Sequence, residues 1–282
     1  ALTVCTPHQT TPAEGLTSPP DALMTACPEP FDSSSSGACV SEDRAWVSEG
    51  PFLTGCAAAP QEPSAVWRCP PRFGLQRRIS ESAFAIDRRE VTRAAYHSCV
   101  LAGVCARPQC GLESLRAPHR ELACRDLNGE RDNHPITGVA LVDASTFCQW
   151  RGGALPTSAQ WEKAARGVDG RSFPWGQRPP HLGPDIIRIN AADATAFEAL
   201  GWRALDHGVS SRPDDVSAYR DGYVGPRAVS EADPSAASPF GVLDMSGNVF
   251  EWTATDADPG QIIRGGSYAS HGYQLRVDTW DV

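Results

Sequence analysis

Ten cysteines give this chain its most evident chemistry, because thiols can pair with one another or bind soft metals. They stand at positions 5, 27, 39, 56, 69, 99, 105, 110, 124 and 148, all within the first 148 of 282 residues. No two of them form the C-x-x-C pair of common zinc sites and thioredoxin-type redox centres. An even number at wide spacing favours disulfide bonds in an oxidising compartment; the alternative is ten reduced thiols in a cytosolic protein.

The cysteine spacing leaves the connectivity open. Cys99, Cys105 and Cys110 flank an expected helix end, where local bridges are predicted. None of the seven histidines stands three or four residues from another, so no helix presents a histidine pair to a metal. Ser267, His271 and Asp278 have the residue types of a hydrolase triad, but no G-x-S-x-G elbow accompanies them. Strand packing is the better explanation of Ser267.

The charge balance argues against a nucleic-acid-binding surface. Acidic residues outnumber basic ones by 34 to 25, whereas phosphate binding needs clustered Lys and Arg. Lys163 is the only lysine, a bias that we attribute to the GC-rich genome of a bacterium. No apolar run approaches the roughly 20 residues of a membrane helix. Together with the cysteines, these features predict an extracytoplasmic protein that is secreted, periplasmic or at the cell surface.

Two regions of the chain differ in composition. Residues 1–43 are rich in Pro and Ser and poor in apolar side chains, so they cannot bury enough surface to offset the entropy of ordering. This stretch is predicted to be a leader or stalk, fastened to the domain by disulfides and able to tether it as a stalk or through a lipid. Residues 44–282 are predicted to form a single domain.

Local signals within that domain predict short strands, three helices and long loops, an irregular α+β architecture. The expected strands cover residues 44–52, 83–87, 249–253, 261–264 and 274–282, the first broken by a Gly-Pro turn. The expected helices cover residues 94–101, 144–151 and 158–166. Thr92, Asp143 and Thr157 are their N-caps, and Gln160 completes a capping box with Thr157.

Four sequence stretches occur together and in a fixed order. They are IDRREVT (86–92), LPTSAQWE (155–162), GVLDMSGNVFEW (241–252) and RGGSY (264–268), with FPWG (173–176) between the second and the third. This combination resembles the formylglycine-generating enzyme family, also called sulfatase-modifying factor domains, over about residues 44 to 282. The resemblance implies a C-type-lectin-like α+β fold that is irregular and rich in loops.

The resemblance also implies calcium sites, since calcium takes carboxylate and backbone carbonyl oxygens. One set of ligands lies around the G-N-x-x-E-W motif: Asp244, Gly247, Val249 and Glu251. A second set maps to Asn190, Ala191, Asp221 and Tyr223. The alternatives are that Glu251 only accepts backbone N–H bonds while Asn248 caps a turn, and that Asp221 is an ordinary solvated carboxylate.

The chain departs from the family where the family's oxidase chemistry resides. That chemistry needs two cysteines shortly after the G-G-S motif, which bind Cu(I) as thiolates. Their positions align with Ser270 and Leu275, and no cysteine follows Cys148. Copper is therefore not expected. The family also closes with a G-F-R-C strand whose cysteine often pairs with the counterpart of Cys148, so Cys148 here must find another partner or stay free.

These features predict a non-catalytic binding or assembly module, a pseudoenzyme that keeps the fold and structural calcium. Its ligand would be a protein, a peptide or a glycan, held by residues within and after the G-G-S motif: Ser267, Tyr268, Ser270, His271 and Tyr273. The alternative is an oxidoreductase-like enzyme with substituted metal chemistry.

Overall fold

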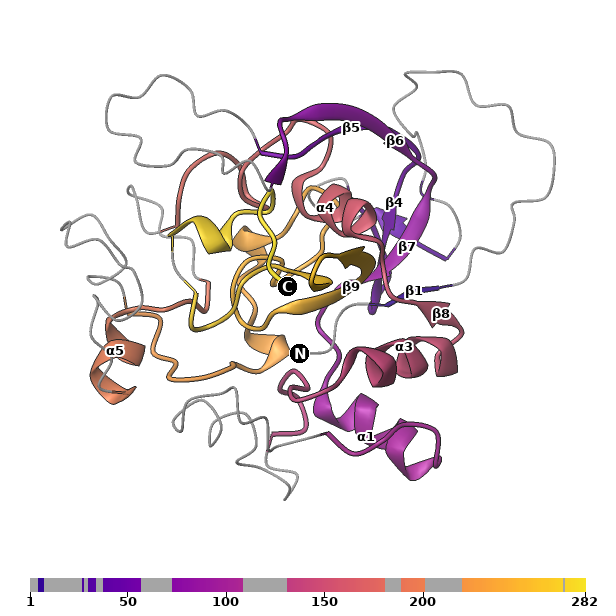
Figure 1. Ribbon diagram of the computed structural model, residues 1–282, viewed down its shortest axis with the longest axis vertical. Coiled ribbons are helices and arrows are strands. Elements are labelled where there is room, and N and C mark those ends of the chain that lie inside the picture. Colours follow the sequence, from indigo (N-terminus) through magenta and orange to yellow (C-terminus); the bar gives the residue numbers. More distant parts are fainter. Residues whose placement is uncertain are drawn as a thin grey trace.

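The computed structural model describes residues 5–7, 27, 30–33, 38–56, 73–108, 131–180, 189–200, 220–270 and 272–282. Within them, the strands pair in four small antiparallel sheets (Figure 1). The largest contains, in spatial order, β2 (Asp32–Ser33), β3 (Cys39–Val40), β4 (Arg44–Val47) and β7 (Phe84–Asp87). Alternate residues of β4 are buried, as expected for a strand with one face on the core.

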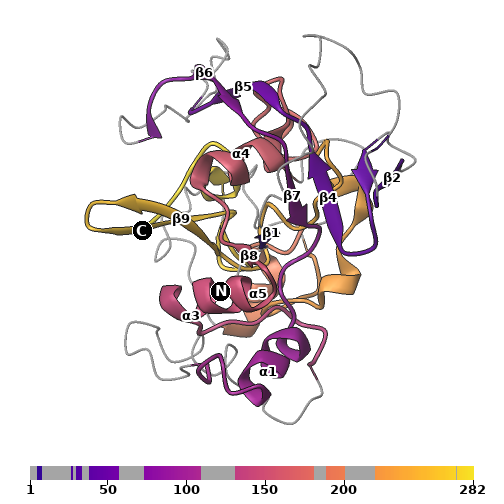
Figure 2. The ribbon, with the colours of Figure 1, turned by 90° about the vertical axis from the view of Figure 1, so that its right-hand side faces the viewer.

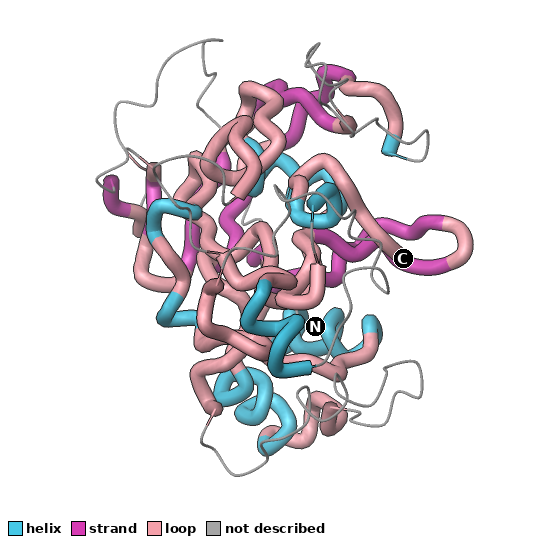
Figure 3. The backbone as a smooth tube through the Cα atoms, turned by 90° about the vertical axis from the view of Figure 1, so that its left-hand side faces the viewer, coloured by secondary structure: helices cyan, strands magenta, loops and turns pink. Residues whose placement is uncertain are grey.

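Three pairs of strands make up the other sheets. The long ribbon of β5 (Gly50–Thr54) and β6 (Arg77–Glu81) arches over α4 in Figure 1. β9 (Glu251–Ala257) and β10 (Gly260–Arg264) form a hairpin whose tip projects from the body of the molecule (Figures 2 and 3). β1 (Thr6–Pro7) pairs with β8 (Gly153–Ala154), which lies about 150 residues further along the chain.

The described helices are α1 (Arg93–Leu101), α3 (Leu141–Trp150), α4 (Ser158–Arg166) and α5 (Ala194–Leu200). Two of the predicted caps are confirmed. The Thr92 side chain accepts a hydrogen bond from Ala95 N, and Thr157 and Gln160 form both bonds of the capping box. Trp161, on the inner face of α4, is fully buried.

Three local predictions are wrong. Helix α3 begins at Leu141 with Ala140 as its N-cap, so that Asp143 lies in the first turn, where its charge favours the helix dipole. Gly50 and Pro51 lie within β5, and the chain breaks between β4 and β5 instead. Residues 274–282 form no continuous strand: the segment begins in a 3-10 turn (Gly272–Leu275), and a single antiparallel bridge joins Asp281 to Ile263 of β10.

The disulfide prediction is confirmed for the cysteines that the structure describes. The bridges are Cys5–Cys148, Cys27–Cys39 and Cys99–Cys105, and Cys56 is also disulfide-bonded. Cys69, Cys110 and Cys124 lie outside the described residues. Cys148 therefore pairs with the N-terminal segment of the chain, in place of the C-terminal cysteine that the family resemblance suggested.

The described parts of the N-terminal 43 residues pack on the rest of the chain. Cys5 and Thr6 are buried, and β2 and β3 extend the sheet that contains β4 and β7. Every helix in the described part of the chain is too short or too polar to cross a membrane.

Candidate functional site

The loop from Asp244 to Val249 leads into strand β9 and has an unusual backbone. Asp244, Gly247 and Asn248 all adopt positive φ, at 55°, 93° and 56°. Glu90, from the first motif of the sequence, holds this loop: its carboxylate accepts hydrogen bonds from Asn248 Nδ2 (2.6 Å) and from Val249 N (3.2 Å). The first and third motifs thus form one unit.

The two predicted calcium carboxylates of this loop already have polar partners. Asp244 forms a buried ion pair with Arg227, and Glu251 Oε2 accepts a hydrogen bond from Trp161 Nε1 (2.9 Å). Burial raises the pKa of Glu90 well above its ordinary value, and the charges of Asp244 and Glu251 raise it further. Glu251 therefore accepts a hydrogen bond from a side chain, the Trp161 indole, whereas the alternative to calcium expected backbone donors. Calcium at Asp244, Gly247, Val249 and Glu251 stays a prediction.

The second predicted site brings acidic side chains close together. Asp221 accepts hydrogen bonds from Ala191 N (3.2 Å) and Tyr223 N (2.7 Å), and its own N–H donates to the Asp193 carboxylate. Burial, together with the charge of Asp193, raises the pKa of Asp221 to about 7. Two carboxylates held this close favour either a proton or a cation between them.

Asn190 directly precedes Ala191 and carries a buried amide group. Its side chain is buried, and Nδ2 donates to Gly225 O (2.9 Å) and Asn248 Oδ1 (2.8 Å). Its Oδ1 is buried and accepts no hydrogen bond from any described residue. The carboxylates of Asp193 and Asp221 and this amide oxygen are of the chemical type that calcium prefers.

Sequence reasoning missed two residues here. Asp193 follows Asn190 by three positions, and this N-A-A-D spacing is a signal that could have indicated it. Arg227 carries no local signal, because it meets Asp244 only in the folded chain. Asp221 accepts hydrogen bonds from the backbone of Ala191 and of Tyr223, and Asn190 precedes Ala191; calcium at these four residues stays a prediction.

The two predicted calcium segments touch each other. Asn248 N donates to Asn190 O (2.7 Å), and a Cβ atom on Gly247 would lie 2.3 Å from that same carbonyl oxygen. Position 247 therefore requires glycine for two reasons: its φ is 93°, and the Asn190 carbonyl leaves no room for a Cβ atom.

Gly247→Ala should lower the free energy of unfolding by about 2 kcal/mol, because the new methyl group displaces the Asn190 backbone. Gly222→Ala is the matched control, since Gly222 also has positive φ (89°) but open space around it. Urea unfolding of both variants measures the difference. Equal losses in the two variants would mean that only φ matters at Gly247.

The two residues that align with the family's copper cysteines are buried and carry no thiol. Ser270 is buried, its Oγ accepts a hydrogen bond from Ser267 N (3.0 Å), and its carbonyl accepts one from Ala192 N (2.9 Å). Leu275 is fully buried in an apolar cluster with Phe173 and Ile189. A hydroxyl and an isobutyl group in these places offer no pair of thiolates.

A shallow hollow, with room for about one water molecule, lies beside the G-G-S segment. It is lined by Phe250, Ile263, Arg264, Gly265, Gly266, Gln274, Thr279, Trp280 and Asp281. The predicted ligand-binding residues are less open than expected: Ser267 and Ser270 are buried, and Tyr268 is half-buried, which raises its pKa to about 12. His271 and the Tyr273 side chain lie outside the described part of the chain.

Comparison with known proteins decides the family. The family model described as "Sulfatase-modifying factor enzyme 1-like domain" matches residues 33–280. The chain belongs to this family. The resemblance that the four motifs carry is thereby confirmed, and the match begins at residue 33, within the segment expected to be a leader.

Curated relatives of this sulfatase-modifying factor domain include active and inactive proteins. The formylglycine-generating enzyme of Mycobacterium tuberculosis is 34% identical over 131 residues, 46% of this chain and 36% of that protein. The mouse protein named "Inactive C-alpha-formylglycine-generating enzyme 2" is 32% identical over 155 residues, 51% of this chain and 42% of that protein. The matched segment thus spans less than half the length of either relative.

The fold is also shared with a solved structure. PvdO from Pseudomonas aeruginosa superposes with a TM-score of 0.56 at 18% sequence identity, covering 89% of this chain and 90% of its own. The sulfatase-modifying factor domain therefore has the C-type-lectin-like α+β fold that the resemblance implied, with few helices and small sheets.

Proposed function

We propose that this chain is a non-catalytic binding or assembly module built on the formylglycine-generating enzyme scaffold, working outside the cytoplasm. The observation that carries the proposal is the absence of a thiol at the two positions that align with the family's copper cysteines. Ser270 and Leu275 stand where thiolates would be needed, one in a hydrogen-bonded turn and the other in the apolar core. The relative whose name says that it is inactive supports the same interpretation.

Calcium is the cofactor that we propose. Asn190, Asp193 and Asp221 would hold it, with the backbone carbonyls of Ala191 and Tyr223, and the loop with Asp244, Gly247, Val249 and Glu251 is the second candidate. The support for the first set is the close pair of carboxylates, Asp193 and Asp221, together with a buried Asn190 Oδ1 that accepts no hydrogen bond from a described residue. Bound calcium would supply positive charge that removes the repulsion between Asp193 and Asp221 and fixes the loops around the G-G-S segment.

We place ligand binding at the hollow beside the G-G-S segment, for a protein, peptide or glycan. Phe250 and Trp280 offer ring surface there, and Gln274 and Asp281 offer polar groups. Ser267 and Ser270, being buried, would shape the turn under the hollow instead of touching the ligand. Tyr268, His271 and Tyr273 remain candidates for direct contact.

The competing function is an oxidoreductase-like enzyme with substituted metal chemistry. Elemental analysis of protein purified without chelator separates the two. Calcium as the sole stoichiometric metal supports the module, and stoichiometric copper or iron supports the enzyme.

We expect the unaltered protein to show no formylglycine formation above buffer with a sulfatase-type cysteine peptide and added copper, and to bind no Cu(I) in competition with bicinchoninate. Ser270→Cys/Leu275→Cys is the matched variant, because it restores both thiols. It should withdraw one equivalent of Cu(I) from the chelator. Turnover by the unaltered protein would overturn the proposal.

A further inference from the structure

The disulfide Cys5–Cys148 joins the first and the last of the ten cysteines in this sequence. It spans 143 residues and encloses the local bridges Cys27–Cys39, which spans 12, and Cys99–Cys105, which spans 6. The other eight cysteines all lie between Cys5 and its partner. Every one of them is closer to Cys5 along the chain than Cys148 is.

Loop closure therefore disfavours the native partner in an unfolded chain. The probability that two residues meet falls with about the 3/2 power of their separation, so Cys27, roughly 20 residues away, meets Cys5 about 15 times more often than Cys148 does. Cys39 is also much nearer than Cys148. Oxidation of the unfolded chain should first join Cys5 to one of these two.

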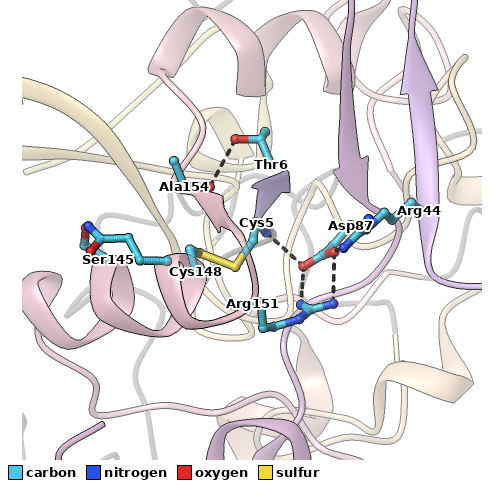
Figure 4. The surroundings of a disulfide bond; sticks show 9 residues. Cys5, Thr6, Arg44, Asp87, Ser145, Cys148, Arg151 and Ala154 are labelled. Atoms are coloured by element: carbon cyan, nitrogen blue, oxygen red, sulfur yellow. Dashed lines mark hydrogen bonds and ion pairs between the residues drawn. A yellow bond between two sulfur atoms is a disulfide. The ribbon is translucent and has the colours of Figure 1, made fainter. Parts of the chain in front are cut away.

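The contacts that select the native pair exist only in the folded domain (Figure 4). Cys5 N donates to Asp87 Oδ2 (2.9 Å), and Asp87 N donates back to Cys5 O (3.0 Å). Arg151 holds the same carboxylate at 2.7 Å, and Thr6 Oγ1 donates to Ala154 O (3.1 Å). All these partners lie at least 80 residues beyond Cys5, on β7, at the end of α3 and on β8.

We infer that this protein is a client of a thiol–disulfide isomerase, a partner that offers a reactive thiolate and acts on Cys5 during folding. The partner is needed because the kinetically favoured Cys5 bridge is not the native one. Cys27 and Cys39, which pair with each other in the fold, are the residues that capture Cys5 first.

The exchange needs no net oxidant. From the mispaired set Cys5–Cys27 and Cys39–Cys148, the isomerase thiolate attacks Cys5 Sγ, and Cys27 leaves as a thiolate. That thiolate attacks Cys39 Sγ, forms Cys27–Cys39 and releases the thiolate of Cys148. Finally, Cys148 attacks Cys5 Sγ in the mixed disulfide, forms the native bridge and returns the isomerase thiolate. Two protein disulfides are present before and after.

The native bridge is removed from further exchange once it forms. Cys5 is 4% exposed and Cys148 is 0% exposed, packed with Tyr96, Phe147 and Leu155. An external thiolate cannot reach either sulfur without unfolding of the segment, whereas a mispaired Cys5 lacks this cover. Burial thus makes the last exchange step effectively irreversible under native conditions.

Refolding of the reduced, full-length protein in a glutathione buffer tests the inference, with active or active-site-inactivated protein disulfide isomerase. Cleavage before aspartate separates the relevant cysteines, since Asp21, Asp32, Asp43, Asp143 and Asp169 bound fragments that hold Cys5, Cys27, Cys39 and Cys148 one each. Mass spectrometry of these fragments over time should show Cys5 joined to Cys27 or Cys39 first. Active isomerase should then speed the appearance of Cys5–Cys148 by about 10-fold.

The variant Cys27→Ala/Cys39→Ala removes the two nearest competitors and should reduce that acceleration to about 5-fold, because Cys56 still meets Cys5 about five times more often than Cys148 does. Cys99→Ala/Cys105→Ala removes another local bridge and should leave the acceleration by active isomerase unchanged. If either variant fails to refold, the fragment map of the unaltered protein still decides. A Cys5–Cys148 bridge that forms before any other Cys5 bridge, at the same rate with active and inactive isomerase, overturns the inference.

Discussion

Replacing Cys5 and Cys148 together by alanine should lower the free energy of unfolding by about 5 kcal/mol. The bridge spans 143 residues, so in the chain-entropy description its loss frees a large part of the unfolded ensemble. Alanine at both positions avoids leaving a buried thiol or hydroxyl without a partner. Guanidinium unfolding followed by tryptophan fluorescence gives the difference from the unaltered protein.

Cys27→Ala/Cys39→Ala is the matched control, because that bridge spans only 12 residues and should contribute about 3 kcal/mol. The difference between the two double variants, about 2 kcal/mol, tests the dependence on loop length. Equal losses would show that loop length does not set the contribution of Cys5–Cys148. A loss below that of the control would mean that the N-terminal strand is weakly attached to the domain.

Chelation of calcium should lower the free energy of unfolding by about 2.7 kcal/mol when the reference sample holds calcium at a hundred times its dissociation constant. The ion would bind the folded chain, where Asp193 and Asp221 lie close together, and not the unfolded one. Thermal melting with calcium and with EGTA measures the effect. Identical melting after confirmed metal removal would contradict calcium as a structural ion.

Two charge-removing variants locate the calcium effect. Asp221→Asn should abolish most of the response to EGTA, because it deletes one of the two adjacent carboxylates. Glu251→Gln should retain most of it, because Arg227 already neutralises Asp244 in the neighbouring loop. The opposite pattern would assign the ion to Asp244, Gly247, Val249 and Glu251.

The pH dependence of the calcium-free protein follows from the same pair of carboxylates. The pKa of Asp221 is raised to about 7, above its ordinary value of 3.8, so the folded state holds a proton that the unfolded state has released. The contribution of Asp221 to stability therefore falls as pH rises from about 4 to about 7. Stabilisation by calcium should accordingly be larger at pH 8 than at pH 5.5, and Asp221→Asn should remove this difference.

The geometry around the G-G-S segment gives these predictions a common basis. Gly247, Asn248 and Asn190 connect the two acidic loops through backbone contacts, and Ala192 N donates to the carbonyl of Ser270. An ion at Asp193 and Asp221 would therefore stiffen the turn that shapes the proposed ligand hollow. Loss of calcium and loss of ligand binding should be coupled.

Local sequence signals predicted the elements that depend on neighbours in the chain. The caps at Thr92 and Thr157 are correct because each side chain bonds a backbone N–H three residues away. The strand predicted at residues 274–282 is reduced to one bridge, between Asp281 and Ile263, and the carbonyl groups of Val277 and Thr279 accept hydrogen bonds from the Arg264 guanidinium instead. Local propensity contains no information about such a donor.

By itself, the sequence determined the family through four ordered motifs and predicted the absence of the family's thiolate copper site, since no cysteine follows Cys148. It also predicted that Asn190 and Asp221 belong to one calcium site. Only the tertiary structure decided that Cys148 pairs with Cys5, that Arg227 neutralises Asp244 and that Asp193 joins Asp221. Bridges and ion pairs between distant residues depend on how the whole chain closes, which no local spacing encodes.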